Sequence, residues 1–194
     1  MTRITLFLCA ALAATPLVGA AGQGSQQPQA VQQVPASTAP APALQPGQRA
    51  EVVFVDPANF TDARDSYTGS DAGRDDILSA LREYMLDEAK RFIPQGDTLF
   101  VSVTDVDLAG EYEPWRGPQW DDVRIVKDIY PPKINLSFRV TDSTGRVLKE
   151  GKRELRDLAF LMNLSMQFRE DRLRHEKTLL DDWFRSEFRD LPKS

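Results

Sequence analysis

Cysteine and histidine are almost absent from this chain, which has one of each among its 194 residues. Zinc sites use several Cys and His ligands, so a zinc centre of the usual kind is excluded. Cys9 lies in a leading apolar stretch that we expect to be cleaved, which leaves no disulfide and no thiol chemistry. His175 lies in a charged helical run, and no serine has a nucleophile motif. A catalytic triad is therefore disfavoured, and we predict an exposed helical histidine.

A long apolar run is also missing. The apolar stretch at residues 4–14 follows the short basic segment Met1–Arg3 and is well below the ~20 residues that a membrane-spanning helix needs. Small residues before Ala21 form a cleavage site. We therefore predict a signal peptide over residues 1–20, cleaved between Ala20 and Ala21. The mature protein is then expected to be exported, to the periplasm, with no transmembrane span.

Positive charge is not in excess, because 24 Lys and Arg residues stand against 29 Asp and Glu residues, a formal net charge of −5. Loss of Arg3 with the signal peptide leaves 23 basic residues and a net charge of −6. A negative net charge weakens attraction to a phosphate backbone. Nucleic acid is therefore not an expected partner.

Charged and aromatic residues are absent from residues 21–48, which contain eight Gln and five Pro. Such a segment buries too little apolar surface to offset the entropy lost on ordering. We predict a disordered Gln-, Pro- and Ala-rich linker there. Residues 49–194 have the length of one domain, large enough to bury about two thirds of its unfolded surface without a metal or a disulfide.

The domain combines strand patterns with helix patterns. Apolar and polar residues alternate along the best strand, and apolar residues recur at three and four along the helices. The predicted elements are strand 51–55, helix 74–92, strand 98–107, a candidate strand within 123–129, strand 133–141, strand 146–154 with a bulge at Gly151, and helix 172–188. We predict an α+β fold, a single two-layer domain with a mixed or antiparallel sheet of about four to five strands and two helices packed on one face. Charges along the last strand suit an exposed sheet edge.

The strand at residues 98–107 ends in two carboxylates. Strict alternation places Asp105 and Asp107 on the same face as Val101 and Val103. Ionised carboxylates are costly to bury in an apolar core. We therefore expect both to lie where the strand reaches solvent or a cation.

Four acidic residues cluster at and after this strand end, namely Asp105, Asp107, Glu111 and Glu113. Carboxylate oxygens this close could hold Ca²⁺, Mg²⁺ or Mn²⁺, and Asp105, Asp107 and Glu111 are the candidate ligands. A D-x-D pair alone is a weak motif. Ion pairs with Arg116 or Arg124 are the alternative that we favour, so no cofactor is expected.

The same carboxylates could perform hydrolysis. Asp105 and Glu111 would be the general acid and base of a glycosidase. The sequence gives neither their separation nor a raised pKa for either group. A carboxylate-dependent or metal-assisted periplasmic hydrolase that uses Asp105, Asp107 and Glu111 is therefore the alternative function, and a protein without catalytic activity is favoured.

Aromatic residues are concentrated in one segment, residues 112–132, which holds two Trp, two Tyr and four Pro. The tryptophans flank a turn, where they either fold onto the core as a lid or form a contact surface; the usual burial of Trp favours the lid. As a contact surface, the segment would use aromatic rings and arginines, which dominate binding hot spots. The candidate binding residues are Tyr112, Trp115, Arg116, Trp120 and Arg124.

Several separated motifs look like those of a known family. They are Val53–Pro57 with Phe60–Asp62, Thr104–Glu111, Asp122–Ile125, Tyr130–Pro132, Glu176–Lys177 and Asp182–Phe184. Over nearly all of residues 51–188 the chain resembles an uncharacterised family of exported bacterial proteins, domain of unknown function 3016. The resemblance implies export and a single domain, and it supplies no catalytic residues.

The sequence thus favours a non-catalytic binding or accessory protein of the cell envelope. Its aromatic loop, with Trp115 and Trp120, would contact an envelope protein or a glycan. Exposed tryptophans around a concave site would support binding, whereas carboxylates converging on the floor of a cleft would support catalysis or metal binding.

Overall fold

The computed structural model describes residues 48–163 and 166–191 of the chain. The predicted signal peptide, its cleavage site and the predicted linker up to residue 47 lie outside the described residues. Within the described ranges, none of the helices is both long enough and apolar enough to cross a membrane.

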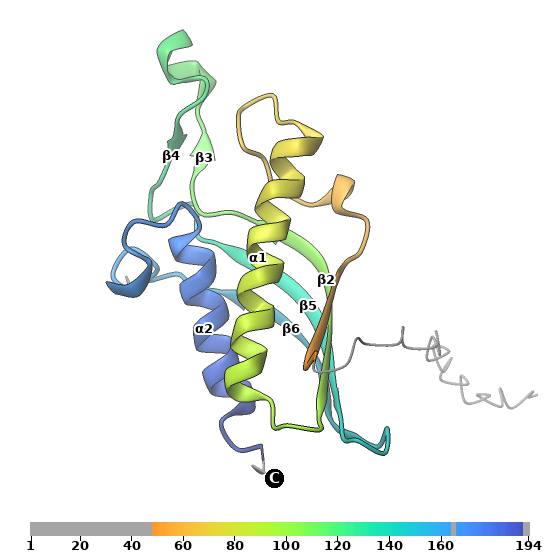
Figure 1. Cartoon of the computed structure of the whole chain (residues 1–194). Coiled ribbons are helices and arrows are strands. Elements are labelled where there is room, and N and C mark those ends of the chain that lie inside the picture. The colour runs from red at the N-terminus through yellow and green to blue at the C-terminus, as the bar shows by residue number, and fades with distance from the viewer. Residues whose placement is uncertain (1–47, 164–165, 192–194) are drawn as a thin grey trace, which may run out of the picture. The chain divides into compact units, whose positions relative to one another are not determined.

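Four strands form the main sheet in the order β1-β2-β5-β6 (Figure 1). β1 (Ala50–Phe54) runs parallel to β2 (Thr98–Asp107). β5 (Lys133–Thr141) pairs antiparallel with β2 on one side and with β6 (Val147–Arg156) on the other. A parallel pair needs a crossover, and the first helix supplies it. The sheet is therefore mixed, and the charged strand β6 forms an edge, as predicted.

Two helices cover one face of this sheet (Figure 1). α1 (Asp71–Phe92) lies over β1 and contacts α2 (Arg174–Phe188), which lies near β6. α1 begins three residues earlier than the apolar spacing indicates, because the Oγ of Ser70 accepts a hydrogen bond of 2.9 Å from the backbone N–H of Gly73. The predicted two-layer α+β fold, with both helices on one face, is confirmed.

The core fills the space between the two helices and the sheet. It contains an aromatic cluster, in which Trp183, Phe184 and Phe188 of α2 meet Phe138 of β5. Its fully enclosed aliphatic side chains include Leu81, Met85, Ile93, Leu99, Val101, Ile134 and Leu180. Burial of these side chains is the main force that holds helices and sheet together.

A small second sheet extends from the end of β2. β3 (Glu111–Tyr112) pairs antiparallel with β4 (Arg124–Ile125), and two 3-10 turns, Pro114–Arg116 and Pro118–Trp120, join them. We call residues 111–125 the ribbon; it stands at the top of Figure 1, where its tip extends beyond the helices. The candidate strand predicted in this region is thus only two residues long.

A bulge in β2 corrects the predicted facing of its two carboxylates. The pairing of β2 with β5 shifts register between Val103 and Asp105. An extra residue in a strand moves every following side chain to the other face. Val106 is therefore buried like Val103, whereas Asp105 and Asp107 are only partly buried. The prediction that both carboxylates share the face of Val103 was wrong because strict alternation does not allow for a bulge.

β6 also contains a register shift, but not at Gly151 as predicted. Gly151 pairs in register with Phe138, and the pairing skips Leu148 instead. A Cβ atom at Gly151 would lie 3.2 Å from the ring of Phe138 and 2.8 Å from a guanidinium nitrogen of Arg153. Glycine therefore stands here because the Phe138 ring and the Arg153 side chain lie close to the backbone.

Candidate functional site

Asp105 is held by a neighbouring loop. Its Oδ1 accepts a hydrogen bond of 2.7 Å from the backbone N–H of Thr61, and its Oδ2 accepts one of 2.9 Å from the Thr61 hydroxyl. The ammonium group of Lys133 lies 3.9 Å from Oδ2. Neither Arg116 nor Arg124, the predicted ion-pair partners, contacts this carboxylate within the described residues. Its partners are therefore a loop backbone, a hydroxyl and a more distant lysine.

A buried carboxylate that sequence reasoning missed, Asp62, organises the arginines around the base of the ribbon. Arg124 donates to both of its oxygens, at 2.9 and 3.2 Å, and the Nε of Arg64 donates at 3.1 Å. Burial opposes ionisation of Asp62, but the hydrogen bonds and charge of Arg124, with those of Arg64, outweigh it and hold the pKa of Asp62 below its ordinary value. Arg64 also reaches Glu111 at 3.3 Å. The predicted ion pairing is thus seen for Glu111, with a different arginine.

The surroundings of Asp107 oppose the ionisation of its carboxyl group. Burial raises its pKa, and the nearby charges of Asp62 and Asp105 raise it further, to about 6, while Lys133 acts in the opposite direction. Such a value suits a general acid.

A metal site is not evident here, since no three His, Cys, Asp or Glu side chains converge within residues 48–163 and 166–191.

Glu113, the fourth acid of the predicted cluster, fixes the inside of the ribbon. Its side chain is buried, and it accepts hydrogen bonds from Lys127, from Arg116 and, at 3.1 Å, from the hydroxyl of Tyr130. The hydrogen bond from Lys127, with those from Arg116 and Tyr130, outweighs desolvation and lowers the pKa of Glu113 to about 2. The predicted pairing with Arg116 is therefore present. Through its contacts with Lys127 and Tyr130, Glu113 also joins the segments before and after the ribbon turns.

The predicted aromatic binding residues divide into two groups. Trp115 is 72% exposed and Trp120 is 38% exposed, so Trp115 does not form a lid over the core. Tyr112 is buried, and the guanidinium of Arg124 lies 4.5 Å from the centre of its ring. Tyr112 and Arg124 therefore support the ribbon from within, while the two tryptophans lie at its surface. Arg116 belongs to neither group, because it is partly exposed and forms an ion pair with Glu113.

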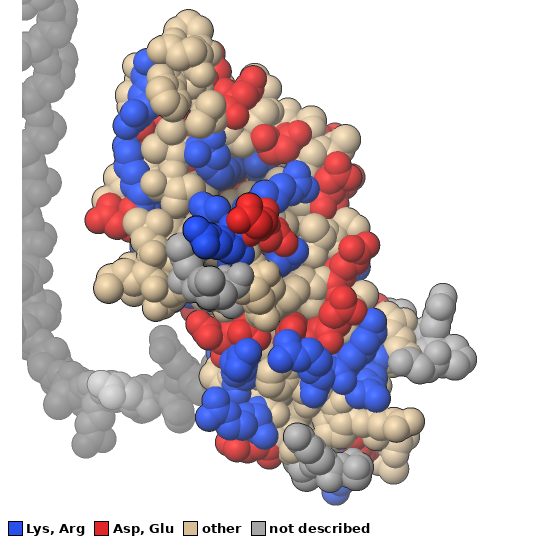
Figure 2. All heavy atoms as spheres, turned by 60° about the vertical axis from the view of Figure 1, so that its left-hand side comes forward, with Lys and Arg blue, Asp and Glu red and all other residues tan. Residues whose placement is uncertain are grey.

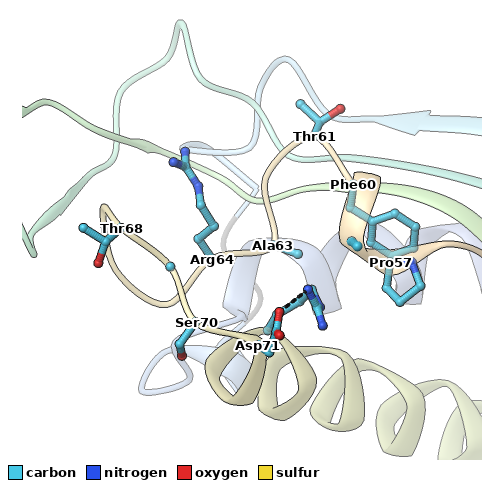
Figure 3. Close-up of a pocket in the computed structure, with 11 residues that line it drawn as sticks. Pro57, Phe60, Thr61, Ala63, Arg64, Thr68, Ser70 and Asp71 are labelled. Atoms are coloured by element: carbon cyan, nitrogen blue, oxygen red, sulfur yellow. Dashed lines mark hydrogen bonds and ion pairs between the residues drawn. The ribbon is translucent and has the colours of Figure 1, made fainter.

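A cavity of about 440 Å³ lies between the loop that follows β1 and the start of α1 (Figure 3). Pro57 and Phe60 form one side, and Arg64 and Thr68 lie on the other, with Arg64 extending away from the Phe60 ring. Asp71 is engaged at 2.8 Å by Arg74 and offers no unpaired charge to this cavity. The carboxylates of β2 and the two exposed tryptophans do not line it.

A second cavity, of about 320 Å³, lies between the base of the ribbon and the first turn of α2. We call it the α2 cavity. Its lining residues are Arg64, Asp65, Ile77, Leu108, Ala109, Tyr112, Arg124, Val126, Arg172, Leu173, Arg174, His175 and Glu176. It brings two predicted binding residues, Tyr112 and Arg124, together with a stretch of α2 that the sequence analysis did not connect to any site. Trp115 and Trp120 lie outside this lining as well.

His175 is buried, which corrects the prediction of an exposed helical histidine. Its ring meets that of Phe160 edge to face at 4.8 Å, and its Nε2 accepts a hydrogen bond of 3.2 Å from the Nε of Arg174. Burial lowers the pKa of His175, and the charge of Arg174 lowers it further. The prediction was wrong because Phe160, from the segment after β6, packs against this position.

In a comparison with protein-family models, residues 48–186 match "Protein of unknown function (DUF3016)". The chain belongs to this family. No curated protein and no solved structure matched the chain. The DUF3016 match covers the main sheet, the ribbon and nearly all of α2, so the described elements form the family domain. It assigns neither a catalytic nor a binding role.

The α2 cavity of this DUF3016 domain could not be predicted from the sequence. Its lining comes from the loop before α1, from α1, from the end of β2, from the ribbon and from α2. Lining residues from separate segments leave no local motif. The one available signal was the charged run at residues 172–177, which looks like an ordinary solvated helix face.

Proposed function

We propose that this protein is a non-catalytic binding or accessory protein of the cell envelope, and that the tip of the ribbon, Pro114–Trp120, is its contact surface. The exposure of Trp115 carries the proposal, because a tryptophan that is 72% exposed contributes little to the core. Tryptophan is enriched in binding hot spots, where a partner covers its large apolar surface.

The ribbon is suited to this role because its interior is fixed by polar contacts. Glu113 joins Lys127, Arg116 and Tyr130 below the tip. Arg124 anchors the base, since it donates to Asp62 and to the carbonyl oxygen of Gly110, at 3.0 Å. A surface that is already ordered loses less conformational entropy when it binds. The tip can therefore present its tryptophans without rearrangement.

A protein is the partner that this surface fits better than a glycan. Val123 and Ile129, which follow the tip in sequence, are 40% and 65% exposed, so aliphatic surface accompanies the tryptophans. Sugar recognition relies on hydrogen-bonding groups beside an aromatic platform. Arg116 is the charged side chain at the tip, and its ion pair with Glu113 makes it less available to a sugar. Mixed aromatic and aliphatic surface is typical of the centre of a protein interface.

The location proposed for this interaction is the periplasm. Support comes from the basic start, the apolar stretch at residues 4–14 and the small residues before Ala21. The mature protein would then begin at Ala21. Intact-mass measurement of exported material tests this, and material that retains Met1 would contradict it.

Hydrolysis by Asp105, Asp107 and Glu111 has less support. The raised pKa of Asp107 is the one feature that suits acid catalysis. Asp105 and Glu111 are engaged by Thr61 and Arg64, and neither cavity described above is lined by any of the three acids. A catalytic pair needs a place for the substrate between its members.

Crosslinking in living cells, followed by identification of the attached protein, tests the proposed contact surface. The double variant Trp115→Ala/Trp120→Ala should lose about 90% or more of the recovered partner, since hot-spot truncation costs 2 kcal/mol or more. Met162→Ala is the matched control, because Met162 is 88% exposed and belongs to the segment between β6 and α2, not to the ribbon. Unchanged recovery from a stable double variant would refute the proposal, and attachment to a glycan alone would refute the choice of partner.

A further inference from the structure

The α2 cavity combines an apolar wall with a cationic rim. Ile77, Leu108 and Leu173 are buried core residues whose side chains reach this space, and Val126 adds a partly exposed aliphatic group. Ligand cavities in proteins are mostly apolar, with a few polar groups that fix orientation, and begin at roughly 300 Å³. A volume of about 320 Å³ therefore suits a small ligand with an apolar body.

Four arginines line the cavity, and they are not equivalent. Arg64 and Arg124 are engaged by Asp62 and Glu111, as described above. Arg172 and Arg174 form no ion pair with any described carboxylate. The Nε of Arg174 is directed to His175, which fixes the side chain, while no described residue accepts from its two terminal nitrogens.

The first turn of α2 adds to this positive rim. The residue before the helix, Leu173, supplies no side-chain hydrogen bond to the first turn, although the backbone N–H of Arg174 donates to the carbonyl oxygen of Asp171 at 3.2 Å. The helix dipole favours an anion at this end. Lys and Arg side chains are interspersed with Asp and Glu side chains on the face of the domain that Figure 2 shows.

Two carboxylates also line the cavity, and both are engaged elsewhere. Asp65 receives weak hydrogen bonds of 3.4 Å from the Ser70 hydroxyl and lies so close to the backbone of Gly73 that a Cβ atom there would be 2.0 Å from its carboxyl group. Glu176 accepts a hydrogen bond of 2.7 Å from the backbone N–H of Ala109. Burial raises the pKa of Glu176, which weakens its opposition to an anionic neighbour.

We propose that the α2 cavity binds a small amphiphilic carboxylate, whose charged group is held by Arg172 and Arg174 and whose apolar body lies against Ile77, Leu108 and Leu173. Planar guanidinium groups pair well with carboxylates, and the apolar wall excludes water from the other end of the ligand. This site is separate from the tip of the ribbon, so it can be present whether or not the tip contacts a protein.

Isothermal titration with three probes tests the two halves of the site. Octanoate has both the charge and the apolar body, 1-octanol has the body alone, and acetate has the charge alone. Octanoate should bind at least about tenfold more tightly than either of the others, because each lacks one of the two interactions. Equal binding of octanoate and octanol would contradict the assignment of the arginines, and absence of octanoate binding would overturn the site.

Two variants of cavity-lining residues test whether octanoate binds in the α2 cavity. Arg172→Gln/Arg174→Gln should weaken octanoate about tenfold or more, through loss of charge-assisted hydrogen bonds. Arg169→Gln is the matched control, since Arg169 is exposed, lies three residues before Arg172 and does not line the cavity. Val126→Phe, which narrows the cavity and leaves every arginine in place, should also weaken octanoate. Unchanged octanoate binding by folded forms of both variants would overturn the proposal.

The ribbon variant separates this proposal from the proposed function. Trp115→Ala/Trp120→Ala should bind octanoate as the unaltered protein does, because neither tryptophan lines the cavity. Loss of the crosslinked partner with normal octanoate binding would support both proposals. Normal partner recovery with no octanoate binding would overturn only the carboxylate site.

Discussion

The tryptophans of α2 and of the ribbon lie in opposite surroundings. Trp183 is 3% exposed, and its ring lies 4.7 to 5.7 Å from the rings of Phe138, Phe184 and Phe188. Trp115 is 72% exposed. The apolar surface of Trp183 is already removed from water and stabilises the fold, whereas that of Trp115 is available to a partner.

Different forces hold the two regions. Packed aromatic rings join α2 to the sheet. The ribbon, by contrast, is fixed by the ion pairs of Glu113 below its tip and by Arg124 on Asp62 at its base. A short two-stranded sheet has little stability of its own, so it depends on these polar contacts. The comparison predicts that core substitutions unfold the domain and that tip substitutions change only binding.

Trp183→Ala should have the largest effect. Removal of this ring leaves a cavity among three phenylalanines, which should lower the free energy of unfolding by ~3 to 5 kcal/mol. Denaturant unfolding followed by circular dichroism measures this change. A loss below about 1 kcal/mol would mean that the aromatic cluster is not the main support of α2.

Arg124→Gln tests the polar anchor between ribbon and core. Asp62 is buried, and it would keep only Arg64 as an ion-pair partner. Breaking a buried pair is strongly destabilising, and we expect a loss of about 2 to 3 kcal/mol, with faster proteolysis within the ribbon. Arg139→Gln serves as the control, since Arg139 and its partner Glu150 are 54% and 63% exposed. Equal stability of the two variants would show that Asp62 does not depend on Arg124.

Asp107→Asn should change the pH dependence of stability. The pKa of Asp107 rises from 3.8 to about 6 on folding, so the folded state holds its proton more tightly than the unfolded chain. The stability that this group contributes is present below pH ~4 and is lost as the pH rises through about 6.

The variant should therefore be more stable than the unaltered protein at pH 8, by about 1 to 2 kcal/mol after allowance for solvent screening, and equally stable at pH 4. Urea unfolding at both pH values measures the difference. Asp122→Asn, at an exposed position, should show no such change. A constant difference between the Asp107 variant and the unaltered protein from pH 4 to 8 would exclude the raised pKa.

Trp115→Ala should have the smallest effect on the fold. Substitution of an exposed residue is usually within about 0.5 kcal/mol, so its unfolding curve should overlie that of the unaltered protein. The contrast with Trp183→Ala is the direct measure of the difference between the two regions. A large loss of stability in Trp115→Ala would mean that the tip packs on the domain and is not a contact surface.

The sequence by itself determined the main elements and the fold class. Residues 133–141 alternate and form β5 with those same bounds, and the spacing of apolar residues places α1 and α2 to within three residues. These patterns are strong because one face of each element packs on the core. The resemblance to the family is likewise a property of the sequence, and the family match confirms it.

Only the tertiary structure decided where individual side chains lie. The bulge between Val103 and Asp105 turns two carboxylates to the other face, and Phe160 covers a histidine that its helix alone would expose. The alignment of Arg124 with Asp62 and the lining of the α2 cavity depend on residues more than 60 positions apart. Local periodicity indicates which face of an element is apolar. Contacts between distant segments form only when the elements pack, because strand register, bulges and loops set the distances between their side chains.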